Sequence, residues 1–135
     1  MNTTTTYDFG DGKGPTPAHQ HPNGGGWVAN TVFVADTAYV GPNACVFGEA
    51  TVSGKARVSG TARVSGRAWV SGRARVYGEA RVYGSASVFG SARVYDEAWV
   101  SGRARVSGEA RVYGEARVYG EARVSNETLS GGART

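Results

Sequence analysis

The sequence predicts an all-β, single-domain parallel solenoid, in which short strands coil around a triangular core. Three observations lead to this fold. Val recurs at every sixth position from Val28 to Val124, 17 times in a row. Ala stands two residues before Val in 15 consecutive repeats, from Ala38 to Ala122, and Gly follows two residues after Val in most repeats. A repeat of this regularity decides the architecture of the whole chain.

Each position of the unit Ala-x-Val-x-Gly-x has a physical role. Side chains alternate across a strand, so Ala and Val face one side and the residue between them faces the other. A helix is excluded, because a six-residue step rotates an α-helix by about 600° and would scatter the Val residues around it. Asn30, Asp96 and Asn126 replace the Gly. Since Asn and Asp tolerate left-handed backbone best after Gly, we expect a positive φ at this corner.

The six-residue unit leaves no room for a hairpin return, so the strands are expected to stack in parallel. Three units close a triangular coil of about 18 residues, and the 17 units make about 5 to 6 coils. With about 4.8 Å between stacked strands, the rod would be about 27 Å tall. We expect residues 1–26 to form an N-terminal cap or tail and residues 27–127 the solenoid. Residues 128–135 would be a C-terminal tail, either with Leu129 as the plug of the open end or disordered.

The composition excludes several other classes of protein. The 135 residues carry a net charge of only +4 and a single Cys, which cannot form an internal disulfide. No run of 18 apolar residues is present, so no transmembrane helix is expected. The N-terminal segment has neither the basic nor the apolar part of a secretory signal. Gly does not recur at every third position, so the chain is not collagen.

Ala-Tyr-Val-Gly-Pro-Asn-Ala-Cys-Val at 38–46 and the repeats after it resemble the hexapeptide-repeat, left-handed parallel β-helix superfamily, over about residues 28–127. This resemblance implies a left-handed coil, whereas the general rule for parallel crossovers favours a right-handed one. His-Pro-Asn-Gly-Gly-Gly-Trp-Val at 21–28 also looks like the start of uncharacterised repeat proteins of bacteriophages and large DNA viruses. That likeness implies a viral or phage protein of the host cytoplasm or the virion.

Many members of this superfamily are acyltransferases, which resemble one another in using a coil histidine as general base, usually at a trimer interface. This chain has only His19 and His21, both before the first repeat, and the related zinc enzymes of the fold need three His ligands. Asp8 and Asp11 could add oxygen ligands to the two His, but this set is weak for a metal. Cys45 has no activating neighbour in the sequence, so a surface or cap-covered thiol is expected. No catalytic residue, metal or cofactor is therefore predicted.

Outward residues 18 positions apart are expected to stack into columns along the rod. The predicted columns are Arg57, Arg75, Arg93 and Arg111; Tyr77, Tyr95 and Tyr113 on the same face; and Glu79, Glu97 and Glu115 at the next corner. The simplest interpretation is a solubility device, in which mixed charges keep the surface hydrated.

The charges are nevertheless uneven along the rod, because no acidic residue lies between Glu49 and Glu79. Arginine suits bidentate contacts to anions and stacking on aromatic rings, so this basic band is a candidate site for a phosphate- or sulfate-bearing polymer or an acidic glycan. The candidate binding residues are Lys55, Arg57, Arg63, Arg67, Trp69, Arg73 and Arg75.

The sequence thus favours a non-enzymatic structural or interaction module that has no membrane partner. Binding of an anionic polymer or glycan through the basic band is one alternative, and a degenerate acyltransferase is another. A homotrimer and a monomer both stay open, because all three faces carry Arg.

Overall fold

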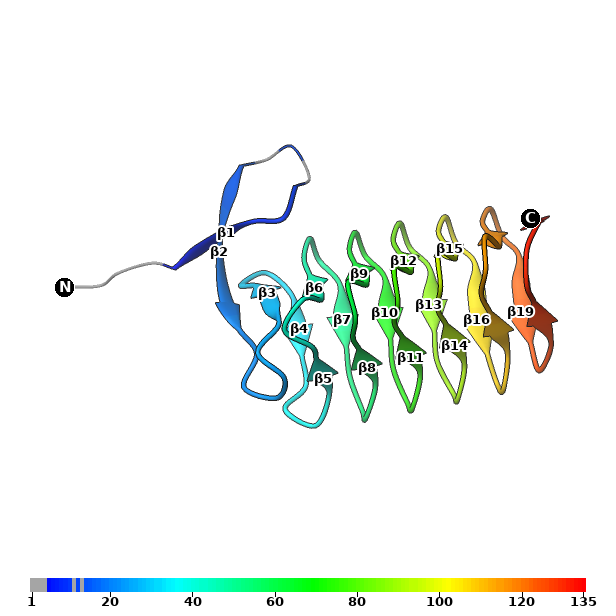
Figure 1. Cartoon of the computed structure of the whole chain (residues 1–135), viewed down its shortest axis with the longest axis horizontal. Helices are drawn as coiled ribbons and strands as arrows, with labels where there is room; N and C mark the ends of the chain where they lie inside the picture. The colour runs from blue at the N-terminus through cyan, green and yellow to red at the C-terminus, as the bar shows by residue number, and fades with distance from the viewer. Residues whose placement is uncertain (1–4, 11, 13) are drawn as a thin grey trace.

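The computed structural model describes residues 5–10, 12 and 14–135, and these form an all-β solenoid whose coils stack along one axis (Figure 1). Most strands of the repeat contain only the residue before the repeated Val and the Val itself. Each pairs in parallel with the strand three places later, as β8 (Arg57–Val58) does with β11 (Arg75–Val76). Arg57 stands opposite Arg75 and Val58 opposite Val76, which confirms that three hexapeptide units close one coil of the solenoid.

The strands form three sheets, one on each side of the triangular rod. The nine-stranded hairpin sheet contains, in spatial order, β1 (Thr6–Asp8), β2 (Pro15–Gln20), β3 (Trp27–Ala29), β6 (Cys45–Val46), β9 (Arg63–Val64), β12 (Arg81–Val82), β15 (Trp99–Val100), β18 (Arg117–Val118) and β21 (Ala133–Arg134). The arginine sheet contains β5 (Tyr39–Val40), β8, β11, β14 (Arg93–Val94), β17 (Arg111–Val112) and β20 (Thr128–Leu129). The tryptophan sheet contains β4 (Phe33–Val34), β7 (Thr51–Val52), β10 (Trp69–Val70), β13 (Ser87–Val88), β16 (Arg105–Ser107) and β19 (Arg123–Ser125).

The repeated Ala and Val side chains fill the interior of the rod, as the alternation predicts. From Ala38 to Val124 each of them is no more than 4% exposed. Val34 in the first coil is only half-buried, because its strand β4 is the first of the tryptophan sheet and pairs on one side with β7. Small side chains suffice because backbone hydrogen bonds hold neighbouring coils together, such as Arg57 N to Ala74 O at 3.0 Å. The interior is therefore one narrow core that continues from coil to coil.

The corners require a left-handed backbone, which explains the Gly of the repeat. Gly84 has a φ of 68°, and Asp96 and Asn126, which replace Gly at two corners, have φ values of 59° and 52°. A Cβ added to Gly84 would lie 2.9 Å from the backbone nitrogen of Gly102, so stacking also leaves no room for a side chain. The expectation for Asn30 is wrong, since its φ is not positive. Its backbone N donates to Pro17 O of β2 at 2.9 Å, and this antiparallel pairing replaces the corner.

The N-terminal residues form an antiparallel hairpin that extends the hairpin sheet beyond the first coil (Figure 1). Strand β1 pairs with β2, and β2 pairs with β3. The turn side of the hairpin folds over the rod and brings Phe9 onto Cys45 and Phe47, in a second small apolar cluster. Arg63 Nη1 donates a hydrogen bond to Phe9 O at 3.0 Å. The hairpin therefore covers the first strand edge and also part of the outer face.

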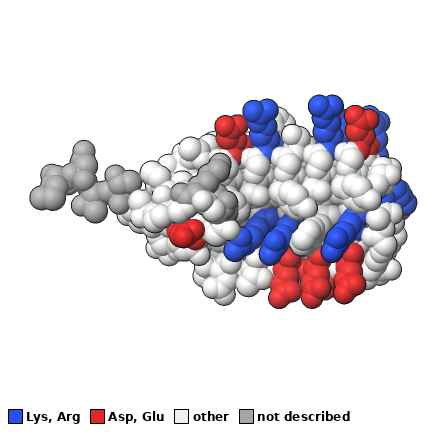
Figure 2. Space-filling view, turned by 90° about the horizontal axis from the view of Figure 1, so that it is seen from above, with Lys and Arg blue, Asp and Glu red and all other residues white. Residues whose placement is uncertain are grey.

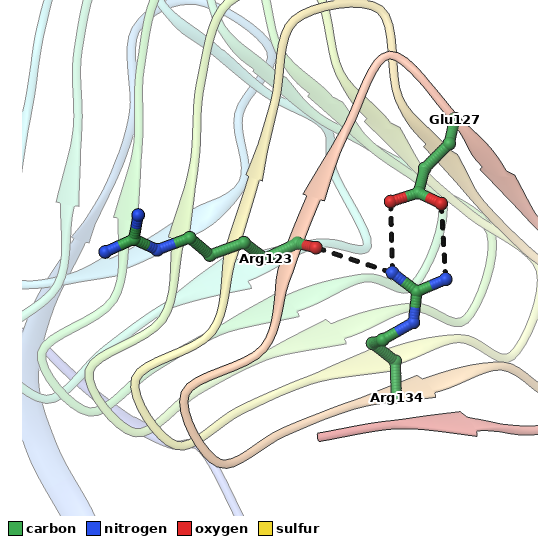
Figure 3. A network of polar contacts seen from close by, with 3 residues as sticks. All are labelled: Arg123, Glu127 and Arg134. Carbon is green, nitrogen blue, oxygen red and sulfur yellow. Dashed lines mark hydrogen bonds and ion pairs between the residues drawn. The ribbon is translucent and has the colours of Figure 1, made fainter.

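The C-terminal residues continue two of the sheets instead of forming a separate tail. Leu129 pairs with Val112 and packs, half-buried, against the core, one position short of the regular step between coils. Arg134 stands opposite Val118, two positions short of that step. Its guanidinium donates to both carboxylate oxygens of Glu127, at 3.0 and 3.2 Å, and to the carbonyl oxygen of Arg123 at 3.5 Å (Figure 3). One guanidinium thus ties the last strand to β19 and to the corner that follows it.

Candidate functional site

Four of the seven predicted binding residues come together on the arginine sheet. Lys55, Arg57, Arg73 and Arg75 line one cleft of about 400 Å³. Two stacked coils supply them, because Lys55 and Arg57 lie one coil before Arg73 and Arg75. We call these four residues the basic cleft.

The wall of the basic cleft comes from the first coil and from the segment before it. Asn23, Thr37 and Tyr39 line this side, and no carboxylate of the described residues takes part in the lining. The guanidinium carbon of Arg57 lies 5.7 Å from the centre of the Tyr39 ring, in a cation–π contact. Asn23 Nδ2 donates to Ala38 O at 3.0 Å, which fixes its position beside the cleft. The cleft therefore offers four cations and several neutral hydrogen-bonding groups to an anion.

The other three predicted residues lie on other parts of the rod. Arg63 belongs to the hairpin sheet and is held by Phe9. Arg67 lies at a corner, where its Nε is 3.4 Å from Glu49 Oε2. Trp69 is on the tryptophan sheet and is 59% exposed. The seven residues thus circle the rod as a band, and only the basic cleft forms a local site.

An arginine row extends the basic cleft along the rod. Arg57, Arg75, Arg93 and Arg111 stand on successive rungs of the arginine sheet, as the spacing of the repeat predicts. Three ion pairs occur among the described residues, and none of them involves this row. Like charges at about 4.8 Å repel one another, so a bound anion would relieve the repulsion between the rungs.

A tyrosine row runs beside the arginine row on the same face. The rings of Tyr77 and Tyr95 stack at 4.9 Å with 3° between their planes, and those of Tyr95 and Tyr113 at 5.0 Å with 5°. Partial burial, followed by the nearby hydroxyls of Tyr77 and Tyr113, raises the pKa of Tyr95. The phenol of Tyr95 therefore stays protonated at neutral pH and can donate a hydrogen bond.

A second and larger groove, of about 820 Å³, lies on the hairpin sheet. Its floor is a row of Arg63, Arg81, Trp99 and Arg117, and the guanidiniums of Arg81 and Arg117 stack on Trp99 at 5.4 and 4.7 Å. Its wall is a row of three carboxylates, Glu79, Glu97 and Glu115. Figure 2 looks onto this sheet and shows the row of acidic side chains beside the row of basic ones.

This mixed-charge groove was not predicted as a site, although the spacing of its residues in the sequence could have indicated it. Arg63, Arg81 and Arg117 share the spacing of successive coils with Trp99. The spacing could not show that the hairpin residues Tyr7 to Gly10 also line the groove.

The two His side chains are engaged in separate structural contacts. His19 Nδ1 lies 2.6 Å from Asn30 Oδ1 on the surface. His21 is 3% exposed, and its Nε2 donates to Ala38 O at 3.0 Å. Among the described residues no three His, Cys, Asp or Glu side chains are grouped to hold a metal, and Asp11 lies outside those residues.

Cys45 points outward from β6 but is covered by the hairpin. Of the two expected alternatives, a surface thiol and a thiol covered by the N-terminal cap, the structure shows the second. It is 7% exposed, and burial raises its pKa to about 11, against a smaller opposing effect of Arg63 and Arg81. A thiol with this pKa is protonated at neutral pH and is a poor nucleophile.

Within the part of the chain that the structure describes, no helix has the length and apolar character needed to cross a membrane.

Comparison with known proteins supports the repeat architecture. Residues 74–90 and 104–120 match the family model described as the YdcK beta solenoid repeat. No curated protein matches the chain. No solved structure matches it either. The match and the geometry agree that the chain is a β-solenoid repeat protein.

Proposed function

We propose that this β-solenoid repeat protein is a non-enzymatic interaction module that binds an anionic ligand in its basic cleft. One observation carries the proposal: four cations from two coils line a single cleft, and no carboxylate of the described chain shares the lining. Arginine makes bidentate hydrogen bonds to carboxylate, sulfate and phosphate, and three of the four cations are Arg. A bound anion would also reduce the repulsion among them.

The state of the His and Cys side chains supports a binding role over a catalytic one. Both His of the chain lie in the N-terminal segment and hold structural contacts, and the thiol of Cys45 is buried and protonated. A degenerate acyltransferase would need a general base near a substrate cleft. We therefore expect no turnover of an acyl-CoA donor with amine or alcohol acceptors, and measurable turnover would contradict the non-enzymatic role.

Chromatography on immobilised heparin tests the basic cleft. The test variant changes Lys55, Arg57, Arg73 and Arg75 to Ser, which lowers the net charge from +4 to zero. We expect this variant to elute at much lower salt than the wild type, because each lost contact to an anion removes part of the electrostatic affinity.

A matched control separates the cleft from net charge alone. The control variant changes four exposed Arg outside the cleft to Ser and has the same net charge: Arg67, Arg103, Arg105 and Arg123. It should elute near the wild type. Equal loss of retention in both variants, or unchanged retention of the cleft variant, would show that the basic cleft is not a binding site.

A further inference from the structure

The arginine row is longer than the basic cleft needs. Arg93 and Arg111 continue it for two rungs, and the four rungs span about 14 Å at about 4.8 Å per step. A single sulfate or phosphate ion cannot reach across four rungs. Beside the row, Lys55 and Arg73 are followed on later coils by Ser91 and then Glu109, so the positive charge decreases toward Arg111. The row therefore suits a chain of acidic groups that begins in the cleft and runs along the rod.

The tyrosine row argues against a single-stranded nucleic acid. Proteins that bind single strands present aromatic faces on which bases stack. Here both faces of Tyr95, and one face each of Tyr77 and Tyr113, are covered by neighbouring rings. Apart from the outer faces of Tyr77 and Tyr113, the row presents ring edges and hydroxyls, and the hydroxyls can form hydrogen bonds to the hydroxyl groups of a sugar.

The glutamate row limits how wide the ligand can be. Glu79, Glu97 and Glu115 line the corner that follows the tyrosine row, together with Gly78, Asp96 and Gly114. Figure 2 shows acidic side chains projecting in a row from this edge of the hairpin sheet. Double-stranded DNA carries a charge about every 1.7 Å of its axis, a much closer spacing than the step of about 4.8 Å between the rungs of the arginine row. A duplex wide enough to extend past the tyrosine row would also meet these carboxylates. A narrow chain with sparser charges avoids them.

We infer that the ligand of the arginine sheet is an acidic polysaccharide chain, carrying carboxylate or sulfate groups, that lies along the rod over Arg57, Arg75, Arg93 and Arg111. This inference rests on the proposed function, since its first contacts are those of the basic cleft. It adds the chemical class of the ligand, its direction and the two rungs beyond the cleft. Arg93 and Arg111 are then contacts for a long ligand only.

Calorimetric titration with size-fractionated heparin oligosaccharides tests the inference. We expect an octasaccharide to bind the wild type at least roughly tenfold more tightly than a disaccharide, because it adds charge-assisted contacts on the outer rungs. The double variant Arg93→Ser with Arg111→Ser should lose this gain and still bind the disaccharide as the wild type does. The control variant Arg81→Ser with Arg117→Ser, on the hairpin sheet, should keep the gain.

Three other results of the titration would contradict the inference. Equal affinity for disaccharide and octasaccharide would overturn the inference and leave the proposed function standing. A thymidine oligonucleotide of similar charge that binds as tightly as the octasaccharide would overturn the polysaccharide class in favour of nucleic acid. No binding of any oligosaccharide would overturn the inference, and no binding of the oligonucleotide either would overturn the proposed function as well. Far-UV circular dichroism of each variant shows whether the solenoid is intact.

Discussion

The guanidinium of Arg63 and the carbonyl oxygen of Phe9 form a 3.0 Å hydrogen bond between residues 54 positions apart. It connects the N-terminal hairpin to β9. Cys45 and Phe47, 7% and 8% exposed, lie in the apolar cluster below Phe9. The contact therefore helps to hold the hairpin over the thiol of Cys45.

Replacing Arg63 with Ala should make Cys45 react faster with a thiol reagent such as Ellman's reagent at pH 8. The hairpin would open more often once its contact to β9 is lost, and the reaction depends on that opening. Arg81→Ala is the control, because Arg81 also lowers the pKa of Cys45 but makes no hydrogen bond to the hairpin in the described chain. Loss of either positive charge alone would slow the reaction, so faster labelling of Arg63→Ala cannot be electrostatic. Equal rates in the two variants would contradict the role of the contact.

Stability should fall between pH 9 and pH 11 because of Cys45. Its pKa is about 11 in the folded protein against 9.0 for an unperturbed thiol, so the unfolded state loses the proton first as the pH rises. The free energy of unfolding should drop by about 1 kcal/mol between pH 8 and pH 10. Urea unfolding at both pH values measures the drop. Cys45→Ala should reduce it by that amount, and an identical drop in the variant would exclude the thiol as its source.

Gly84→Ala should destabilise the protein more than Gly120→Ala does. Both Gly have a positive φ, 68° and 67°, so each Ala costs about 1 kcal/mol for the left-handed backbone. Only at Gly84 would the new Cβ approach backbone closely, at 2.9 Å from Gly102 N, whereas at Gly120 the nearest atom is 3.8 Å away. We expect the free energy of unfolding to differ by at least about 1 kcal/mol between the variants. Equal losses in urea unfolding would show that stacked corners adjust without strain.

Val76→Asp should unfold the central coils, whereas Arg75→Asp should not. Val76 is fully buried and its neighbour Arg75 points outward. An unpaired charge in the core costs about 3–5 kcal/mol, while the surface change should cost about 1 kcal/mol or less. Urea unfolding followed by circular dichroism measures both. Similar midpoints for the two variants would mean that the core is open to water.

The six-residue period was sufficient to predict the coils, because Ala, Val and Gly satisfy packing and corner geometry in the same way at each repeat. It could not predict the hairpin, whose position depends on contacts that occur once, such as Phe9 on Phe47. The shortened last coil was missed for a similar reason. After Val124 the repeat ends, and Leu129 and Arg134 take their places by pairing with the previous coil.

Only part of the basic cleft could be predicted from the sequence. The repeat spacing correctly stacks Arg57 on Arg75. The same spacing separates Arg67 and Trp69 from them, because residues on successive strands belong to different sheets. Tyr39 of the wall follows from the same spacing, since it stands 18 positions before Arg57 and opposite it. Asn23 could not be assigned, because the irregular segment before the first coil has no period from which to place it.

The three-sided coil also makes the surface sensitive to insertions that the core would accept. Inserting three hexapeptides together adds one complete coil, and every outward row keeps its partners. Inserting a single hexapeptide after Gly84 would satisfy the Ala and Val core equally well, but it would move every later strand to the next side, so Arg93 would stack on Arg81 instead of Arg75. Folding therefore tolerates insertions of any whole number of hexapeptides, whereas binding of a ligand along the arginine row tolerates only insertions of whole coils.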